Sequence, residues 1–167
     1  VLDRLIRMDV VERLAPINDE RSKKKAGYYI SDNLSLFYFR YIFRYSSQLK
    51  IMDEEVFYEK YIHKDFEEWF VPHRFEEICK QYLIRQNRMG NIEPVIEKIG
   101  KYYYDAPDNH TNGEFDVVTY DEKGYAFYEV KFRKRPVSKD IIEAEIQQVK
   151  KTGLDCYKYV FISRAGF

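Results

Sequence analysis

The sequence has few of the residues that build metal-clustered or disulfide-rich domains. Among 167 residues there are two cysteines, five prolines and seven glycines. Cys79 and Cys156 stand far apart and form no CxxC pair, which argues against a structural zinc site and gives no reason to expect a disulfide. Two free thiols fit a reducing compartment, so we expect a cytoplasmic protein.

The sequence also lacks long apolar runs and an excess of one charge. No stretch approaches the roughly 18 consecutive apolar residues of a membrane-spanning helix, and no signal-peptide pattern is present. The formal net charge is zero, which removes the usual argument for nucleic-acid binding from a basic pI. A neutral net charge does not exclude a nuclease, because a nuclease site needs only a few acidic residues for a metal ion and a few basic residues beside them. No G-x-x-x-x-G-K-[ST] loop occurs, so we expect no ATP binding by this region.

The chain does contain enough apolar residues for a core, since they make up 45% of it. It starts at Val1 and stops at Phe167 in an apolar run, so we expect a fragment of a longer protein. The patterns predict three regions: the end of a winged helix with a linking helix over 1–50, a helical linker over 51–65, and an α/β domain over 66–167.

The first half reads as helical. Residues 1–14 carry apolar residues at helical spacing and predict a helix. The polar run NDERSKKKAG at 18–27 predicts a flexible wing, and GYYIS predicts a short strand. Residues 32–49 predict an aromatic-rich helix, with Asp32 or Asn33 placed to cap it. A helix followed by a basic loop between short strands is typical of the end of a winged helix.

The second half changes character. A helix is predicted over 74–86, with an apolar face made of Phe75, Ile78, Cys79, Tyr82 and Leu83. Strands are predicted at 99–104, 113–120 and 125–132, a helix at 138–152 and a buried strand at 156–163. The order of helix, three strands, helix and strand predicts an α/β fold with a mixed sheet flanked by helices.

The two strands on either side of DEKG carry the residues of chemical interest. If Tyr120 and Tyr125 close a four-residue loop, Asp116 lies opposite Glu129. Two carboxylates opposed in a sheet repel each other, and carboxylate oxygens are the ligands that Mg²⁺ prefers. The same register sets Glu114 opposite Lys131. The competing interpretation is a solvated face with a surface salt bridge worth at most about 1 kcal/mol.

GEFDVV followed by YEVKF resembles the signature of the PD-(D/E)XK nuclease superfamily. The resemblance implies that Asp116 and Glu129 bind Mg²⁺ or Mn²⁺ and that the backbone carbonyl of Val130 adds a ligand. It implies that Lys131 serves the attacking water. One departure is that Phe115, not proline, precedes Asp116.

The superfamily also tends to carry a glutamate on the helix before the sheet, and FEEICKQYL resembles that element. On a helical wheel Glu76 borders the apolar face, whereas Glu77 points the opposite way. We therefore favour Glu76 as the fourth residue of the catalytic group and its third acid, with a plain salt bridge as the alternative.

The run KFRKRPVSK places further basic residues just past the expected site. We predict that four of them contact phosphates of a nucleic acid: Arg133, Lys134, Arg135 and Lys139. A solvated turn is the competing interpretation. His63, His73 and His110 share no ligand spacing, so we expect no site from histidine.

More specifically, the order of YYISDNLSLFYFRYIF, FEEICKQYL, IGKYYY, GEFDVV, YEVKF and VFISRAGF resembles the C-terminal part of archaeal-type P-loop ATPases. The resemblance implies a fused N-terminal ATPase region as a partner, with DNA as the second. We therefore expect metal-dependent phosphodiester hydrolysis of the DNA endonuclease type. The alternative is a non-catalytic module that docks DNA or a partner protein, or that regulates the fused ATPase.

Overall fold

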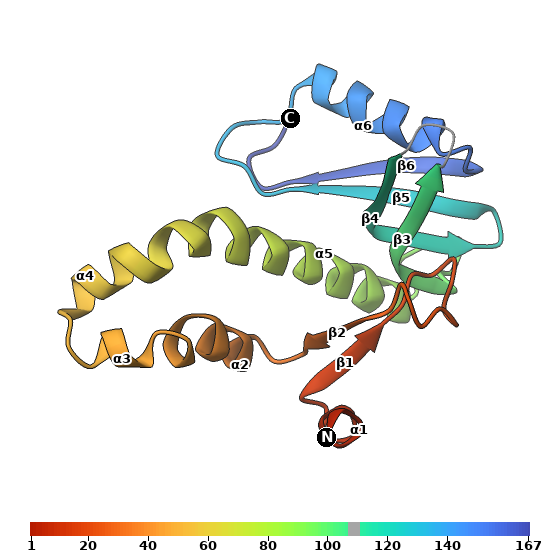
Figure 1. Ribbon diagram of the computed structural model, residues 1–167. Coiled ribbons are helices and arrows are strands. Elements are labelled where there is room, and N and C mark those ends of the chain that lie inside the picture. The colour runs from red at the N-terminus through yellow and green to blue at the C-terminus, as the bar shows by residue number, and fades with distance from the viewer. Residues whose placement is uncertain (107–110) are drawn as a thin grey trace. The chain divides into compact units, whose positions relative to one another are not determined.

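The computed structural model describes residues 1–106 and 111–167 (Figure 1). It divides into two compact units: residues 1–14 with 26–71, and residues 15–25 with 72–167. The sequence-based division set the boundary at residue 66 and kept 15–25 with the first half. His110 lies outside the described residues.

The first unit begins with a helix and a two-stranded sheet. Helix α1 (Leu2–Arg7) leads into β1 (Val11–Leu14), which pairs antiparallel with β2 (Gly27–Ile30). The predicted helix over 1–14 is therefore wrong beyond Arg7. Asp9 has a φ of 55°, which a right-handed helix does not admit, and the β-branched pair after it favours a strand.

The rest of the first unit is a chain of short helices: α2 (Asn33–Phe37), η1 (Tyr38–Phe43), α3 (Ser46–Leu49), α4 (Glu54–Tyr58), η2 (Glu59–His63) and η3 (Phe66–Phe70). Asp32 is the cap of α2, since its carboxylate accepts a hydrogen bond from the Ser35 backbone N–H. The aromatic side chains build the core of this unit, around buried Tyr41, Phe57, Ile62 and Phe70.

The second unit has the predicted order of elements: α5 (Val71–Arg88), β3 (Lys98–Ala106), β4 (Thr111–Asp121), β5 (Gly124–Lys131), α6 (Lys139–Lys151) and β6 (Cys156–Ser163). The sheet order is β3-β4-β5-β6. The first three strands are antiparallel and β6 runs parallel to β5. The predicted α/β fold with a mixed sheet flanked by helices is confirmed.

Helices α5 and α6 lie on opposite sides of this sheet (Figure 1). Towards α6, Phe115, Val118 and Phe127 pack around Val149. On the other side a second cluster joins Leu83 of α5 to Val117, Ala126 and Tyr128. Both faces are therefore buried over the middle of the sheet, so polar functional groups are expected at the ends of the strands.

The expected apolar face of α5 is only partly correct. Cys79 and Leu83 are buried, whereas Ile78 and Tyr82 are 57% and 58% exposed. Helical spacing alone does not show how wide the buried stripe is, and here the stripe is narrow.

The turn between β4 and β5 is tighter than predicted. Tyr120↔Tyr125 pairs as expected, but Asp121↔Gly124 pairs as well, so the connection is a two-residue turn. Gly124 has a φ of 112°, a conformation that favours glycine. Among the described residues, no helix combines the length and the apolar character needed to cross a membrane.

Candidate active site

The candidate site lies where β4 and β5 separate. Their ladder runs from Asp121↔Gly124 to Val117↔Tyr128, in the predicted register. It ends one pair short of Asp116 and Glu129, so these two residues do not form the expected cross-strand pair. Figure 1 shows β3 and the first part of β4 crossing the direction of β5 and β6.

A β-bulge causes this separation. Gly100 pairs with Val118 and Tyr102 pairs with Phe115, so Asp116 and Val117 together stand opposite Lys101. A bulge of this kind bends its strand and re-aims a side chain. Asp116 is the residue re-aimed here.

The bulge also moves Glu114. The predicted pair of Glu114 with Lys131 is wrong: Glu114 pairs with Tyr103 of β3. Its carboxylate contacts Lys101 Nζ at 2.6 Å, and the same ammonium contacts Asp116 Oδ1 at 3.0 Å. Burial acts to lower the pKa of Lys101, but these two carboxylates outweigh it and the net shift of the pKa is upward. Lys101 is therefore a charged ammonium beside Asp116.

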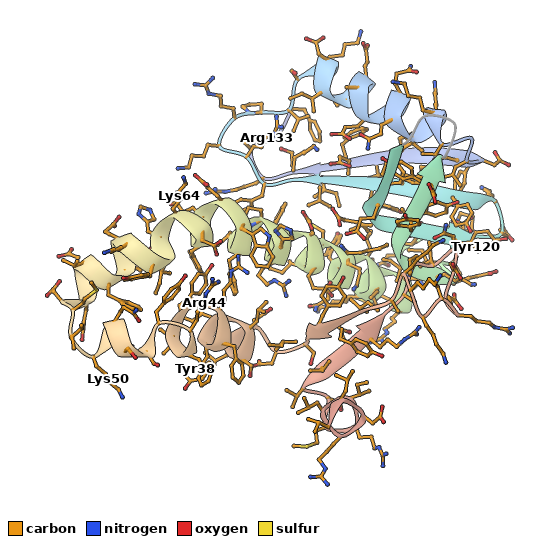
Figure 2. All side chains as sticks on the ribbon, in the orientation of Figure 1. Tyr38, Arg44, Lys50, Lys64, Tyr120 and Arg133 are labelled. Carbon is orange, nitrogen blue, oxygen red and sulfur yellow. The ribbon has the colours of Figure 1, made fainter. Side chains whose placement is uncertain are left out.

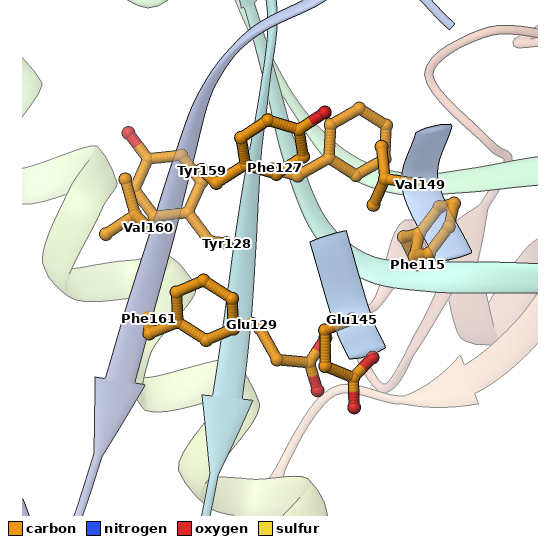
Figure 3. Close-up of a pocket in the computed structure, with 9 residues that line it drawn as sticks. All are labelled: Phe115, Phe127, Tyr128, Glu129, Glu145, Val149, Tyr159, Val160 and Phe161. Carbon is orange, nitrogen blue, oxygen red and sulfur yellow. The ribbon is translucent and has the colours of Figure 1, made fainter. Parts of the chain in front are cut away.

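A second lysine joins two carboxylates on the α6 side. Glu129 and Lys131 follow Phe127 at alternate positions of β5, so they share its face. Lys131 Nζ lies 2.5 Å from Glu129 Oε1 and 2.7 Å from Glu145 Oε1 of α6. Figure 3 shows the carboxylates of Glu129 and Glu145 side by side, next to a wall of aromatic side chains.

The environment shifts the pKa values of both Glu129 and Lys131. Burial raises the pKa of Glu129, and the nearby Lys131 only partly offsets that rise. For Lys131 burial acts downward on the pKa, but the hydrogen bonds to Glu129 and Glu145 win and raise it. Lys131 is thus held as a cation in a fixed position.

Glu76 of α5 approaches the same place from the other side of the sheet. Burial raises its pKa to about 7, and the charges of Asp116 and Glu129 add to the rise while Lys101 opposes it. The three carboxylates of the predicted site are therefore close enough to feel one another. Glu77 behaves differently: its carboxylate pairs with Lys80 at 2.9 Å on the same helix. Glu77 is nevertheless partly buried, as Glu76 is, so the contrast drawn from the helical wheel is weaker than expected.

The chemistry of this group fits a hard divalent cation, although the carboxylates now point at ammonium groups. Asp116, Glu129 and Glu76 offer oxygen donors only, the type that Mg²⁺ and Mn²⁺ take. Within residues 1–106 and 111–167, no three His, Cys, Asp or Glu side chains already stand together as metal ligands. A cation would relieve the repulsion from Asp116 and Glu129, which adds to the effect of burial in raising the pKa of Glu76. The side chain of Val130, whose backbone carbonyl was the third predicted metal donor after Asp116 and Glu129, packs in the cluster facing α5.

The predicted phosphate-binding residues lie on the loop from β5 to α6. Arg133, Lys134 and Arg135 are exposed, and Lys139 in the first turn of α6 is exposed beside Glu143. Figure 2 shows Arg133 extending from this loop. The four basic residues thus line one end of the sheet, next in sequence to Lys131.

Contacts at two points fix this loop. The ring of Phe132 packs on Phe75 of α5 with 5.3 Å between ring centroids, and the Arg164 guanidinium lies 4.6 Å from the Phe132 centroid. Further along, Val137 is buried and its N–H donates to the Gly166 carbonyl. The loop is therefore anchored at both ends.

Sequence reasoning missed Lys101 and Glu145. Glu145 had a usable signal, because it lies four residues before buried Val149 and so shares its face of α6. Lys101 had a weaker one, as a single cation within the aromatic strand IGKYYY. Neither signal shows which oppositely charged side chain Lys101 or Glu145 contacts.

Residues 38–149 match the DUF234 family, described as archaeal and bacterial proteins of unknown function. The chain belongs to this family. A similar protein is an uncharacterised protein of Methanocaldococcus jannaschii, 32% identical over 167 residues, which cover 94% of this chain and 34% of the relative. The DUF234 chain thus spans about a third of that relative's length. No solved structure matches it.

The DUF234 match includes the whole candidate site. Its range runs from η1 to the last turns of α6 and so contains Glu76, Lys101, Asp116, Lys131 and the other acidic residues around them. The site is therefore part of the region that relates this chain to its family.

Proposed function

We propose that this DUF234 chain carries a metal-dependent nuclease site of the PD-(D/E)XK type that hydrolyses phosphodiester bonds in DNA. One observation carries the proposal: where β4 and β5 separate, Glu129 pairs with Lys131, and the charges of Asp116 and Glu129 both act on Glu76 of α5. Three carboxylates from three elements, with one lysine, form a donor set suited to a divalent cation and a phosphate.

The proposed roles follow from the contacts. Asp116 and Glu129, with the Val130 carbonyl, would hold Mg²⁺ or Mn²⁺. When bound, the cation would polarise the phosphate and acidify a water molecule. Because its contacts raise the pKa of Lys131, that side chain is charged at neutral pH and is suited to orient a water or a phosphate oxygen. Glu76, with a pKa of about 7, can hold or accept a proton near neutral pH.

Basic residues outside the metal site would bind phosphates that flank the scissile bond. Arg133, Lys134, Arg135 and Lys139 lie exposed on the anchored loop and the helix start next to Lys131. Arginine and lysine in such a position contact phosphates and fix the register of a nucleic acid without reading its sequence. Since the chain spans about a third of its relative, we also propose that a P-loop ATPase region belongs to the whole protein.

A second candidate function is a non-catalytic module that docks DNA or a partner protein, or restrains the ATPase. The lysine contacts favour it: Asp116 and Glu129 each already pair with an ammonium. In this reading the carboxylate–lysine pairs hold the sheet end together and no cation is needed.

Cleavage separates the two candidates. The purified chain is incubated with plasmid and linear DNA in Mg²⁺ or Mn²⁺, beside the Asp116→Ala and Lys131→Ala variants. We expect both variants to lose at least about 100-fold in rate, the size of effect seen when one transition-state contact is removed. Glu76→Gln and Glu77→Gln form a matched pair on one helix, and only the first should be impaired.

The opposite result is equally informative. Folded, metal-supplied protein that neither cleaves DNA nor binds Mn²⁺ would refute the nuclease and favour the docking or regulatory module. Cleavage that persists in both variants would place the activity elsewhere.

A further inference from the structure

The ion pairs around Lys101 are arranged as one ammonium shared by two carboxylates. Lys101 Nζ lies 2.6 Å from Glu114 and 3.0 Å from Asp116. The bulge sets this up, because it places Asp116 and Val117 opposite Lys101. Both carboxylates therefore reach the same ammonium from one strand.

The two carboxylates differ in their expected roles. Asp116 is a proposed cation ligand, whereas Glu114 is not. An ammonium in contact with Asp116 Oδ1 competes with a divalent cation for that oxygen, since like charges so close repel each other. Glu114 makes the shorter contact, so Lys101 keeps a partner when its contact with Asp116 is lost.

We propose that Lys101 is a built-in competitor for the cation on Asp116, and that Glu114 is the positioning residue that receives Lys101 when the cation binds. This inference rests on the proposed metal site. In the free protein the ammonium neutralises Asp116; when a divalent cation takes Asp116, the ammonium stays on Glu114 beside the site. The affinity for the cation is thus set by the balance between the two carboxylates.

This exchange predicts opposite signs for two substitutions. Lys101→Met removes the competitor, so Mn²⁺ should bind more tightly. Glu114→Gln removes the alternative partner, so Lys101 then pairs with Asp116 alone and Mn²⁺ should bind more weakly. Each substitution changes the net charge by one, in opposite directions, so the control variants must show how much of either effect is due to charge alone. We expect about a fivefold change in Kd each way, or about 1 kcal/mol at 1.4 kcal/mol per tenfold.

The test is a titration of the chain with Mn²⁺ in 150 mM KCl, with the free ion followed by its electron paramagnetic resonance signal. Lys98→Met is the matched control, because Lys98 lies on the same strand but pairs with Glu20. Glu122→Gln, in the β4–β5 turn, controls for loss of a carboxylate. Lys101→Arg keeps the competing charge and should bind Mn²⁺ as the unaltered chain does.

Circular dichroism in EDTA checks folding of each variant. If Lys101→Met does not fold, Glu114→Gln and Lys101→Arg still decide the matter. Mn²⁺ binding that is equal in the unaltered chain, Lys101→Met and Glu114→Gln overturns the exchange while the metal site stands. Binding weakened by Lys101→Met also overturns it. No Mn²⁺ binding by any of these proteins refutes the metal site itself and the exchange with it.

Discussion

Replacing Glu76 by glutamine tests the electrostatics of the site without requiring any catalysis. Burial and the charges of Asp116 and Glu129 raise the pKa of Glu76 to about 7 from its ordinary 4.5. Between these pH values the folded protein binds more protons at this position than the unfolded chain does. The free energy of unfolding therefore falls as pH rises from about 4.5 to 7, and stays lowered above that.

The size of the effect follows from the shift. Each pKa unit corresponds to about 1.4 kcal/mol, so the full difference would be about 3 kcal/mol. Glu76 is only partly buried, and solvent screening reduces such values. We therefore expect Glu76→Gln to gain about 1–2 kcal/mol over the unaltered chain when the pH is raised from 5 to 8.

Urea unfolding in EDTA at pH 5, 6, 7 and 8 measures this gain, with Glu77→Gln as the control. Glu77 pairs with Lys80 on the same helix, so its loss should change stability by under about 0.5 kcal/mol at every pH. Equal pH dependence for Glu76→Gln and the unaltered chain would refute the reasoning. Saturating Mn²⁺ should also flatten the pH dependence of the unaltered chain, because a cation compensates the charge that Glu76 acquires.

Three further substitutions test other parts of the structure. Phe127→Ala removes a ring that is 4% exposed and packs against Phe115, so it should cost about 3–5 kcal/mol in urea unfolding; a loss under 1 kcal/mol would contradict its place in the core. Changing Arg133, Lys134 and Arg135 together to glutamine should lower DNA affinity and reduce the slope of log K against log salt by about 2–3, measured by fluorescence anisotropy; an unchanged slope would exclude phosphate contacts by the loop. Asp65→Ala removes two hydrogen bonds of 2.7 Å from an arginine and one of 2.5 Å from a buried tyrosine, so thermal unfolding of the first unit should show a loss of about 1–3 kcal/mol; an unchanged midpoint would show that the network contributes nothing.

The second unit was largely predictable because its patterns are local. The alternation of residues around the turn predicted the register of β4 and β5, and Tyr120↔Tyr125 is confirmed. Ser138 was expected at the start of a helix and is the residue before α6. The apolar run 156–163 coincides with β6. In each case neighbours in sequence decide the structure.

The bulge at Asp116 was not predictable in the same way. A period-two pattern assumes that every residue of one strand faces one residue of the next. Here two residues face Lys101, and that mismatch depends on the partner strand. The strand at Val11–Leu14 was not predicted for a related reason. Its pairing with Gly27–Ile30 outweighs the helical spacing of apolar residues in this segment.

Both of the expected metal ligands pair with lysines: Asp116 contacts Lys101 because of the bulge, and Glu129 contacts Lys131 of its own strand. Five carboxylates gather around two ammonium groups: Glu114 and Asp116 on Lys101, Glu129 and Glu145 on Lys131, and Glu76 near both Asp116 and Glu129. Fully ionised, this group carries an excess of three negative charges in a partly buried place, which is unfavourable. Without a divalent cation, a proton retained on Glu76 reduces the excess, and burial together with the charges of Asp116 and Glu129 raises the pKa of Glu76 to about 7. A bound divalent cation would remove most of the excess, so occupancy of the proposed site and ionisation of Glu76 must be linked.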